Sequence, residues 1–257
     1  MIDVQNIVKS FDDHLVIKDI SATFDPGKTN LIIGRSGSGK TVFMKILIGL
    51  MRPDSGKILY NGRNLPNMKK KELNMLRREM GMLFQGSALF DSMTVMENVM
   101  FPLTMFTRDS RKERERRVNF CLERVNLKEA GASYPGEISG GMMKRVAIAR
   151  AISLNPKYLF CDEPNSGLDP KTALLIDDLI HDITLEYNMT TVINTHDMNS
   201  VMNIGEKIIF INNGKKEWEG TKDEIMNSSN QELNDFVFAS DLFKKVKEIE
   251  NLAYEEG

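Results

Sequence analysis

One short stretch, GRSGSGKT at residues 34–41, constrains the fold more than any other part of this chain. It fits the phosphate-binding pattern GxxxxGK[ST], which roughly 1 chain in 100 of this length would contain by accident. Here the apolar run LIIG precedes it, and Phe43, Ile46, Leu47 and Leu50 follow it at helical spacing. The alternative, a Gly-Ser turn at the surface, would require neither the apolar run before the loop nor the helical pattern after it. The sequence therefore predicts a strand–turn–helix unit whose glycine-rich loop binds phosphate.

The chemistry of this loop follows from its residue types. Glycines expose successive backbone N–H groups to phosphate oxygens, and the positive end of the following helix faces the anion. Lys40 would reach the β- and γ-phosphates, and the Thr41 hydroxyl would coordinate Mg²⁺. The predicted nucleotide-binding residues of the loop are Gly34, Arg35, Ser36, Gly37, Ser38, Gly39, Lys40 and Thr41.

Alternating strand and helix patterns place this loop in an α/β fold. The N-terminal stretch, roughly residues 2–33, alternates short apolar runs with turns, and we expect it to contain an antiparallel β part. Later runs typical of strands are KILYNG, which ends in an Asn-Gly turn, then MGMLFQ, YLFCD, TVINT and KIIFIN. Strands that alternate with helices favour a mostly parallel core sheet. Helical patterning over about residues 86–155 predicts an inserted helical lobe.

Composition limits the partners and the compartment. The chain has 34 basic and 36 acidic residues, so its charge gives no reason to expect nucleic acid as a partner. Its longest uncharged stretch, residues 80–90, is shorter than the roughly 18 to 20 residues of a membrane-spanning helix. The N-terminus lacks the layout of a secretory signal. Cys121 and Cys161 lie in apolar patterns, which fits small core residues in a reducing cytosol.

Two carboxylates follow the apolar run YLFC at the end of a predicted strand. In a parallel sheet, ligands bind outside the carboxyl ends of the strands, where Asp162 and Glu163 would lie. Asp162 suits the shell of Mg²⁺, through a water molecule. Glu163 is placed to orient or deprotonate an attacking water. An ordinary turn at a strand end is an equal alternative for the motif alone, but the phosphate loop upstream favours the catalytic interpretation.

A second glycine turn, in ISGGMMKRVAIARA from Ile138 onward, opens another predicted helix. Its exposed N–H groups, the Ser139 hydroxyl and the helix N-terminus would form a second anion site with Gly140 and Gly141. This peptide resembles the signature peptide of ABC ATPases, which usually has Leu at the first position and Gln after the glycines. Here Ile138 and Met142 stand in those places, and Met142 lacks the polar group of the family pattern.

Further matches follow in the order of the ABC family. The resemblance implies that Gln85 is the Q-loop glutamine near Mg²⁺ or the attacking water, and that Asp169 is the D-loop residue linking two nucleotide sites. His196 is similar to the switch histidine at the γ-phosphate, and Phe11 occupies the place of the aromatic residue that stacks on adenine. Taken singly, each has an ordinary structural explanation. Their shared order over residues 1–225 favours an ABC ATPase domain.

The resemblance implies an activity and an assembly. We expect a P-loop NTPase of the ABC type that hydrolyses ATP with Mg²⁺, and the lack of an Asn-Lys-x-Asp motif argues against a GTPase. The predicted catalytic residues are Lys40, Gln85, Glu163 and His196, and the predicted metal-contacting residues are Thr41, Gln85 and Asp162. In ABC proteins the signature of one subunit faces the P-loop of another. A single copy of each motif therefore implies a homodimer.

A narrower resemblance concerns the substrate. The stretch FQGSALFDSMTVMENVMFPL, from Phe84, and the EGT of residues 219–221 resemble ATPases of Mla-type phospholipid transporters. That resemblance implies a membrane permease, a lipid-binding subunit beyond it, and a position on the inner face of the cytoplasmic membrane in a Gram-negative-type envelope. Two alternatives stay open: a nucleotide-gated scaffold of the cell-division type, and an importer ATPase for another small substrate.

The segment before and after Phe84 is rich in methionine. These methionines are Met75, Met80, Met82, Met93, Met96, Met100 and Met105. Flexible thioethers suit irregular cores and adaptable grooves, and core packing is the expected role of most of them. ABC ATPases nevertheless receive the coupling helix of the permease at this segment. The charged run at residues 111–117 mixes both signs, which predicts the solvated face of a helix.

The segment at residues 226–257 is predicted to be a helical tail. From residue 241 onward, apolar residues recur at helical spacing: Leu242, Val246, Ile249 and Leu252. A single helix cannot bury such a stripe and is marginal alone at this length. Packing on its own lobe and crossing to the partner chain both remain open, and the resemblance to Mla-type ATPases implies the second.

Overall fold

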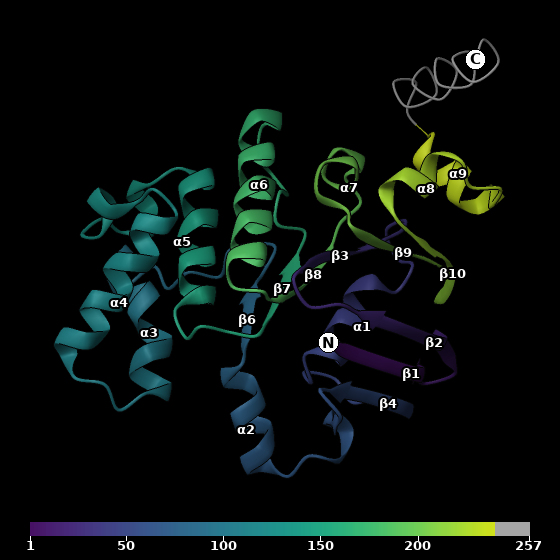
Figure 1. Ribbon diagram of the computed structural model, residues 1–257, viewed down its shortest axis with the longest axis horizontal. Coiled ribbons are helices and arrows are strands. Elements are labelled where there is room, and N and C mark those ends of the chain that lie inside the picture. Colours follow the sequence, from purple (N-terminus) through teal and green to yellow (C-terminus); the bar gives the residue numbers. More distant parts are fainter. Residues whose placement is uncertain (240–257) are drawn as a thin grey trace.

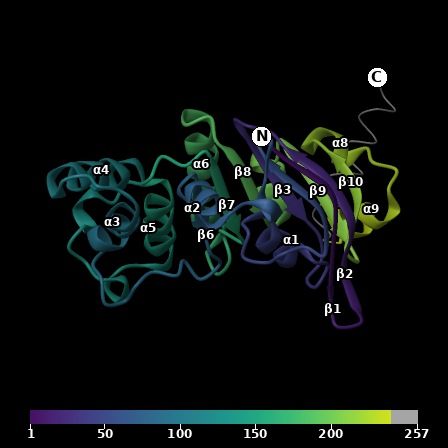
Figure 2. The same cartoon turned by 90° about the horizontal axis from the view of Figure 1, so that it is seen from below.

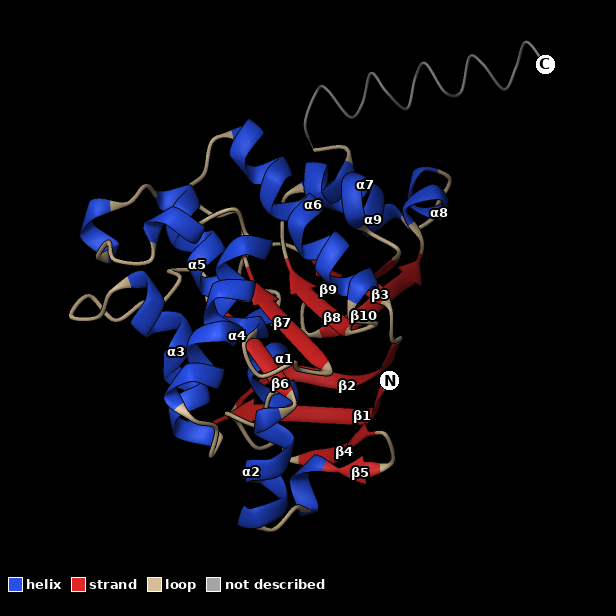
Figure 3. Ribbon diagram, turned by 60° about the vertical axis from the view of Figure 1, so that its left-hand side comes forward, coloured by secondary structure: helices blue, strands red, loops and turns tan. Residues whose placement is uncertain are grey.

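A computed structural model of the chain describes residues 1–239, which form two β-sheets and a set of helices beside them (Figures 1 and 3). The larger sheet has the order β10-β9-β3-β8-β7-β6, and the smaller has the order β2-β1-β4-β5. The strands of the larger sheet are β3 (Lys28–Ile33), β6 (Met80–Leu83), β7 (Tyr158–Asp162), β8 (Thr190–Asn194), β9 (Lys207–Asn212) and β10 (Lys215–Gly220). Those of the smaller sheet are β1 (Ile2–Phe11), β2 (His14–Phe24), β4 (Ser55–Tyr60) and β5 (Arg63–Asn64).

The larger sheet is parallel except at one edge. Strand β3 pairs in parallel with β8 and β9, and β7 pairs in parallel with β8 and β6. Only β10 runs antiparallel, against β9, within the described chain. The smaller sheet is antiparallel throughout its described pairings. Both predictions, a mostly parallel core sheet and an N-terminal antiparallel part, are confirmed.

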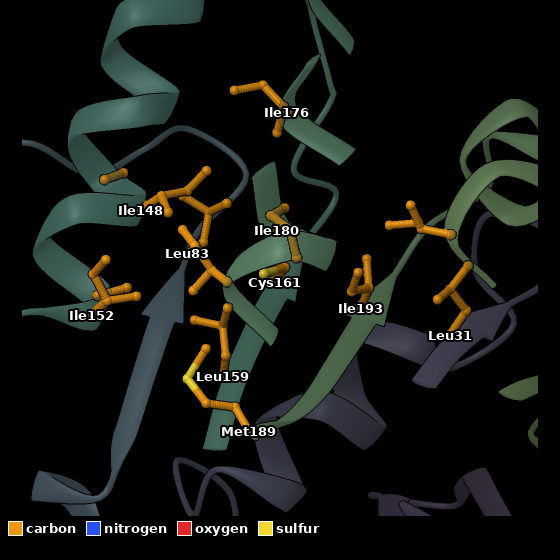
Figure 4. Close-up of a cluster of buried hydrophobic side chains, with 14 of the residues drawn as sticks. Leu31, Leu83, Ile148, Ile152, Leu159, Cys161, Ile176, Ile180, Met189 and Ile193 are labelled. Atoms are coloured by element: carbon orange, nitrogen blue, oxygen red, sulfur yellow. The ribbon is translucent and has the colours of Figure 1, made fainter. Parts of the chain in front are cut away.

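Both faces of the large sheet are covered, which explains its continuous apolar strands. Successive residues of a strand point to opposite faces. Accordingly, Leu31 and Ile33 join the core that contains α5 (Gly140–Ile152) and α6 (Pro170–Glu186). Ile32 instead joins the core that contains α1 (Lys40–Leu47) and the smaller sheet. Leu159 and Phe160 divide in the same way. Figure 4 shows part of the first core, with Leu31, Leu159 and Ile193 directed toward the helices.

The helices fall into two groups. Helices α3, α4 and α5 form a lobe at one side of the molecule, which confirms the predicted helical insertion (Figures 1 and 2). The others lie against the sheets. Their bounds are α1 (Lys40–Leu47), α2 (Lys70–Arg78), α3 (Val95–Phe106), α4 (Arg111–Arg124), α5 (Gly140–Ile152), α6 (Pro170–Glu186), α7 (Met198–Ile204), α8 (Lys222–Met226) and α9 (Gln231–Val237). Short 3₁₀ turns cover Leu65–Asn67, Lys128–Ala130 and Pro135–Glu137.

One expectation about a helix face is wrong, and the solvated face predicted for residues 111–117 holds except at Arg117. Leu50 does not continue the stripe of α1, because the helix ends at Leu47 and Gly49 adopts φ +71°, so that Leu50 is 61% exposed. Arg117, in the charged run, is not simply solvated. Its guanidinium donates to the carbonyl oxygens of Ile152 and Ser153 at the C-terminal end of α5, at 2.7 and 3.0 Å.

The methionine-rich segment is less buried than expected, since each of its seven methionines stays at least partly accessible. Met96 and Met100 pack against one core, and Met80 and Met82 pack against the other. Met105 is 61% exposed. The two cysteines, by contrast, are buried as predicted, and burial raises the pKa of the Cys121 thiol to about 11.

The chain after the last strand packs on the sheet. Leu233 and Val237 of α9 are buried in the core that contains α5, and the Phe236 ring stacks on Phe210 of β9 with 5.5 Å between centroids. The predicted tail helix from residue 241 onward lies outside the described residues.

Candidate active site

The strand order gathers the predicted nucleotide residues at one edge of the sheet. Strands β3, β8, β7 and β6 are consecutive neighbours and parallel, so their carboxyl ends meet at the same edge. The loops that leave this edge carry residues 34–41, His196, Glu163 and Gln85 respectively. This is the position where open parallel sheets bind ligands.

The backbone of the glycine-rich loop leaves no room for a side chain at Gly34 and adopts a conformation at Gly39 that favours glycine. A Cβ at Gly34 would lie 2.1 Å from the carbonyl oxygen of Ile211, and Gly39 adopts φ +106° at the start of α1. The Ser38 hydroxyl is buried, and it has no hydrogen-bond partner among the described residues. An open N–H cradle with an unsatisfied buried hydroxyl fits a phosphate group.

Lys40 is already directed into this loop. Its ammonium donates to the carbonyl oxygens of Gly34 and Arg35 at 2.7 and 3.1 Å, and the side chain is 7% exposed. Burial lowers the pKa of Lys40, and the carboxylates of Glu163 and Asp162 oppose that shift. A phosphate beside the ammonium would act in the same direction as these carboxylates. Thr41, the next residue, is exposed.

The two predicted carboxylates are held by the neighbouring strand. Asn194 Nδ2 donates to Asp162 Oδ1 at 3.1 Å, and the Glu163 backbone N–H donates to the Asn194 carbonyl at 3.0 Å. Glu163 adopts φ +49°, a left-handed conformation that costs a non-glycine residue about 1 kcal/mol or more. Its carboxylate lies 2.8 Å from His196 Nδ1. The fold thus brings together the predicted base and the predicted switch histidine.

Gln85 lies beyond its strand rather than at the strand end. Strand β6 stops at Leu83, and the Gln85 side chain is exposed, with Nε2 donating to Ser166 Oγ at 3.2 Å. This contact joins the loop after β6 to the loop after β7. Gln85 therefore lies near the end of the strand that carries Asp162 and precedes Glu163. Among the described residues, its side chain makes no hydrogen bond to either carboxylate.

Eight of the predicted site residues line one or the other of two cavities. One, of about 760 Å³, is lined by Arg35, Ser36, Glu163 and His196 among others. The second, of about 570 Å³, is lined by residues of the SGG turn and the loop before α6: Ser139, Gly140, Gly141 and Asp169. The structure does not bring the SGG turn to the phosphate loop of the same chain.

The residues of the second cavity also begin two helices. Ser139 Oγ accepts from the Met142 N–H at 3.3 Å at the start of α5, and Asp169 Oδ1 accepts from the Thr172 N–H at 3.0 Å at the start of α6. The hydrogen bond from Thr172 lowers the pKa of Asp169. The Met142 side chain packs partly against the core of the helical lobe, where a thioether is favoured over the family's amide.

Phe11 remains a prediction. It ends β1, is 42% exposed, and has the Lys9 ammonium 5.5 Å from its ring centroid. Its strand partner β2 lies beside the phosphate loop, because a Cβ at Gly39 would come within 2.9 Å of the Ile17 side chain. This places the β1–β2 pair on the nucleotide side of the sheet.

Sequence reasoning missed a buried polar network behind the catalytic loop. Asn165 Nδ2 donates to Asp177 Oδ1 of α6 at 2.7 Å and to Ser200 Oγ of α7 at 3.0 Å. Asp177 is 1% exposed, and burial raises its pKa to about 6, with Asp197 and Asp178 adding to the shift and the bonds from Ser200 and Asn165 opposing it. Along the sequence, Asp177 is one polar residue on an amphipathic helix, so no local signal distinguishes it.

The raised pKa of Asp177 predicts a pH-dependent stability. Because the pKa of Asp177 is higher in the folded chain than in the unfolded chain, the folded chain binds more protons than the unfolded chain between about pH 4 and 6. The free energy of unfolding therefore falls as the pH rises through this window. We expect Asp177→Asn, relative to the unmodified chain, to gain roughly 2 kcal/mol in free energy of unfolding between pH 4 and 7. Urea denaturation at both pH values measures this.

Asp182→Asn is the matched control, since Asp182 is an exposed acidic residue of the same helix and is not among the groups that raise the pKa of Asp177. Its stability difference from the unmodified chain should stay nearly constant over the same pH range. An equally constant difference for Asp177→Asn would contradict the prediction.

Comparisons with known proteins agree with this geometry. A family model described as ABC transporter matches residues 17–166. The methionine import ATP-binding protein MetN of Campylobacter jejuni is 37% identical over 257 residues, covering 94% of this chain and 76% of that protein. The intermembrane phospholipid transport system ATP-binding protein MlaF of Haemophilus influenzae is 34% identical over 237 residues, covering 92% and 90%.

A solved structure extends the comparison to the fold. It is a dimeric ATP-binding cassette in a post-hydrolysis state, bound to ADP and Pi. The match has a TM-score of 0.78 and 32% sequence identity, and it covers 86% of this chain and 99% of that one.

Proposed function

This chain belongs to the ABC transporter family, and from that premise we propose that it is the ATP-hydrolysing subunit of a transporter that moves phospholipid between membranes. ATP and Mg²⁺ are the cofactors of the family, and ATP hydrolysis is its chemistry.

The residues around the phosphate loop would bind and orient the nucleotide. The loop N–H groups and the Ser38 hydroxyl would bind phosphate oxygens, and Lys40 would move its donors from the carbonyls of its own loop to the β- and γ-phosphates. Thr41 and Asp162 would hold Mg²⁺, with Gln85 beside them; the bound ion neutralises phosphate charge.

Glu163 would act on the attacking water. Its carboxylate is fixed from two sides, by the left-handed backbone and by His196 Nδ1 at 2.8 Å. A base that is held in place before the reaction loses little orientational entropy when it accepts a proton. His196 would stand at the γ-phosphate, as the family resemblance implies.

The division of the nucleotide contacts between two cavities supports a two-chain site. Arg35 and Ser36 of the phosphate loop line one cavity with Glu163, whereas Ser139, Gly141 and Asp169 line the other. A second copy of the chain, related by a two-fold axis, would bring the SGG turn of each subunit to the phosphate loop of the other. We therefore propose a homodimer with two composite sites.

An exposed apolar surface supports a permease partner. Phe84 and Phe90, in the loop before α3, are 40% and 41% exposed, and Met105 and Phe106 at the end of α3 are 61% and 38% exposed. Aromatic and methionine side chains at a surface favour contact with another protein. In the described part of the chain, no helix is long and apolar enough to span a bilayer. We propose that the chain binds a permease at the inner face of the cytoplasmic membrane through this surface.

Phospholipid is the proposed cargo because the stretch from Phe84 through residue 103 resembles Mla-type ATPases and because MlaF matches over 90% of its length. A lipid-binding subunit beyond the permease belongs to the same proposal. Import of a small substrate is the second candidate, and the identity of 37% to MetN favours methionine.

The cargo is tested with the complex purified from native membranes through a tag on this chain and reconstituted in proteoliposomes. We expect ATP to drive transfer of a fluorescent phospholipid to acceptor vesicles, and we expect no uptake of radioactive methionine. The same complex carrying Glu163→Gln should lose the transfer, which controls for passive exchange. ATP-driven methionine uptake without lipid transfer would replace the phospholipid proposal with the importer.

A further inference from the structure

Two cations of α5 bind the loop that carries Gln85. The Lys144 ammonium donates to the Gln85 carbonyl oxygen. The Arg150 guanidinium donates to the Ser87 and Ala88 carbonyls at 2.6 and 2.7 Å. Three carbonyls of one short loop are thus held by one helix, whose first turn is the SGG peptide.

Lys144 is buried and Arg150 is partly buried, so both cations depend on protein acceptors in place of water. Lys144 is 4% exposed, and a buried ammonium is strongly disfavoured unless acceptors surround it. Burial lowers the pKa of Lys144, and Cys161 and Glu163 oppose the shift. Burial also lowers the pKa of the Arg150 guanidinium. Neither side chain is simply a hydrated charge at the protein surface.

The loop itself is strained where α5 holds it. Ser87 and Ala88 adopt φ +61° and +48°, two successive left-handed conformations in residues other than glycine. Each costs about 1 kcal/mol or more, and such strain persists only where the surroundings impose the conformation. The two carbonyls of these residues are the ones that Arg150 binds.

The strand before the loop is also packed tightly on α5. A Cβ at Gly81 of β6 would lie 2.5 Å from the Ala151 carbonyl oxygen, so the two backbones are in close contact. Leu83 lies beside Ile148 and Ile152 in the shared core (Figure 4). The end of β6, the loop that carries Gln85 and helix α5 are therefore packed closely enough to move together.

We propose that Lys144 and Arg150 are positioning residues that make the Gln85 loop move with α5, so that engagement of Ser139 by the nucleotide of the partner site places Gln85 in the chain's own site. Lys144 lies five residues after Ser139, about 7 Å along the helix axis. A displacement at the start of α5 therefore reaches the Gln85 carbonyl through a single side chain. This inference rests on the composite site proposed above.

The test compares Lys144→Met with the unmodified full-length chain. Steady-state ATPase gives kcat, and a fluorescent ATP analogue gives the Kd of nucleotide binding. We expect kcat to fall about tenfold or more while Kd changes less than about threefold, because the phosphate loop is untouched and only the placement of Gln85 is lost.

Arg117→Met is the matched control. Arg117 also donates to two carbonyls at the C-terminal end of α5, those of Ile152 and Ser153, but it makes no described hydrogen bond to the Gln85 loop. Its loss should lower the Tm without lowering kcat by more than about twofold. Equal effects of the two variants on kcat would mean that Lys144 only stabilises the fold, and the proposal would be overturned.

A double-mutant cycle tests whether Lys144 acts through Gln85. In a Gln85→Ala background, Lys144→Met should cause no further loss of kcat, whereas independent residues would give multiplied losses. Multiplied losses overturn the proposal. If Lys144→Met does not fold, Arg150→Lys takes its place in the cycle, since it keeps the charge but loses the paired contact to Ser87 and Ala88. Absence of ATPase in the unmodified chain would contradict the proposed function instead, so the two failures are distinguishable.

Discussion

Replacing Glu163 with Gln will slow ATP hydrolysis by about 10²- to 10⁴-fold and leave ATP binding intact. The substitution keeps the shape of the side chain and removes only its ability to accept a proton. Nothing in the phosphate loop changes, and Lys40 keeps its position on the Gly34 and Arg35 carbonyls. The loss should therefore appear in kcat, while the Kd of a fluorescent ATP analogue should stay within about threefold.

The same variant should accumulate as a dimer in the presence of ATP. A composite site closes around bound nucleotide and reopens after hydrolysis, so blocked hydrolysis leaves the closed dimer as the stable species. Size-exclusion chromatography with and without ATP detects this. Glu206→Gln is the matched control, because Glu206 also lies beside a histidine, with 3.8 Å to His181 Nδ1, but outside the site. Unchanged steady-state ATPase in Glu163→Gln would remove Glu163 from the catalytic role.

Two inactive variants will restore activity when mixed, if the site is shared between chains. Lys40→Ala removes the ammonium from the phosphate loop and should abolish tight nucleotide binding. Ser139→Arg places a bulky side chain at the SGG turn and should leave nucleotide binding by its own phosphate loop intact. In a mixed dimer, the intact phosphate loop of the second variant faces the intact SGG turn of the first. Each mixed dimer therefore contains one complete site.

Random mixing in equal amounts should recover up to about a quarter of the unmodified ATPase activity, since half of the dimers are mixed and each has one of two sites. Each variant alone, at the same total concentration, should remain nearly inactive. Activity should also rise more steeply than in proportion to protein concentration. Full ATPase activity in a demonstrated monomer, independent of dilution, would exclude the shared site.

The stretches that the sequence determined by itself are those in which neighbouring residues decide the structure. In GRSGSGKT, glycines with positive φ form the loop, and the helix follows in the same segment, so the phosphate site could be read from residues 34–41 alone. The apolar run before Asp162 likewise predicts a buried strand that ends at the ligand edge of the sheet. Local conformational preference and periodicity are sufficient for such elements because each spans a few residues.

The tertiary structure decided which of these elements meet. Strand β8 lies between β3 and β7, and its parallel pairing with β7 brings His196 against Glu163 across 33 residues of sequence. No pattern within either segment specifies the order of strands, since any parallel arrangement would bury the same apolar residues. The strand-end position predicted the role of Glu163, and the family resemblance predicted that of His196, whereas the fold supplied their contact.

Burial of charged residues was equally beyond the sequence. Lys144 and Arg150 of α5 and Asp177 of α6 are charged residues, for which solvation is the ordinary expectation. Each instead has a hydrogen-bond partner from a distant segment: the Gln85 carbonyl for Lys144, the Ala88 carbonyl for Arg150, and the Asn165 amide for Asp177. A side chain's desolvation depends on what packs over it, and that is a property of the assembled core rather than of the residue and its neighbours in the chain.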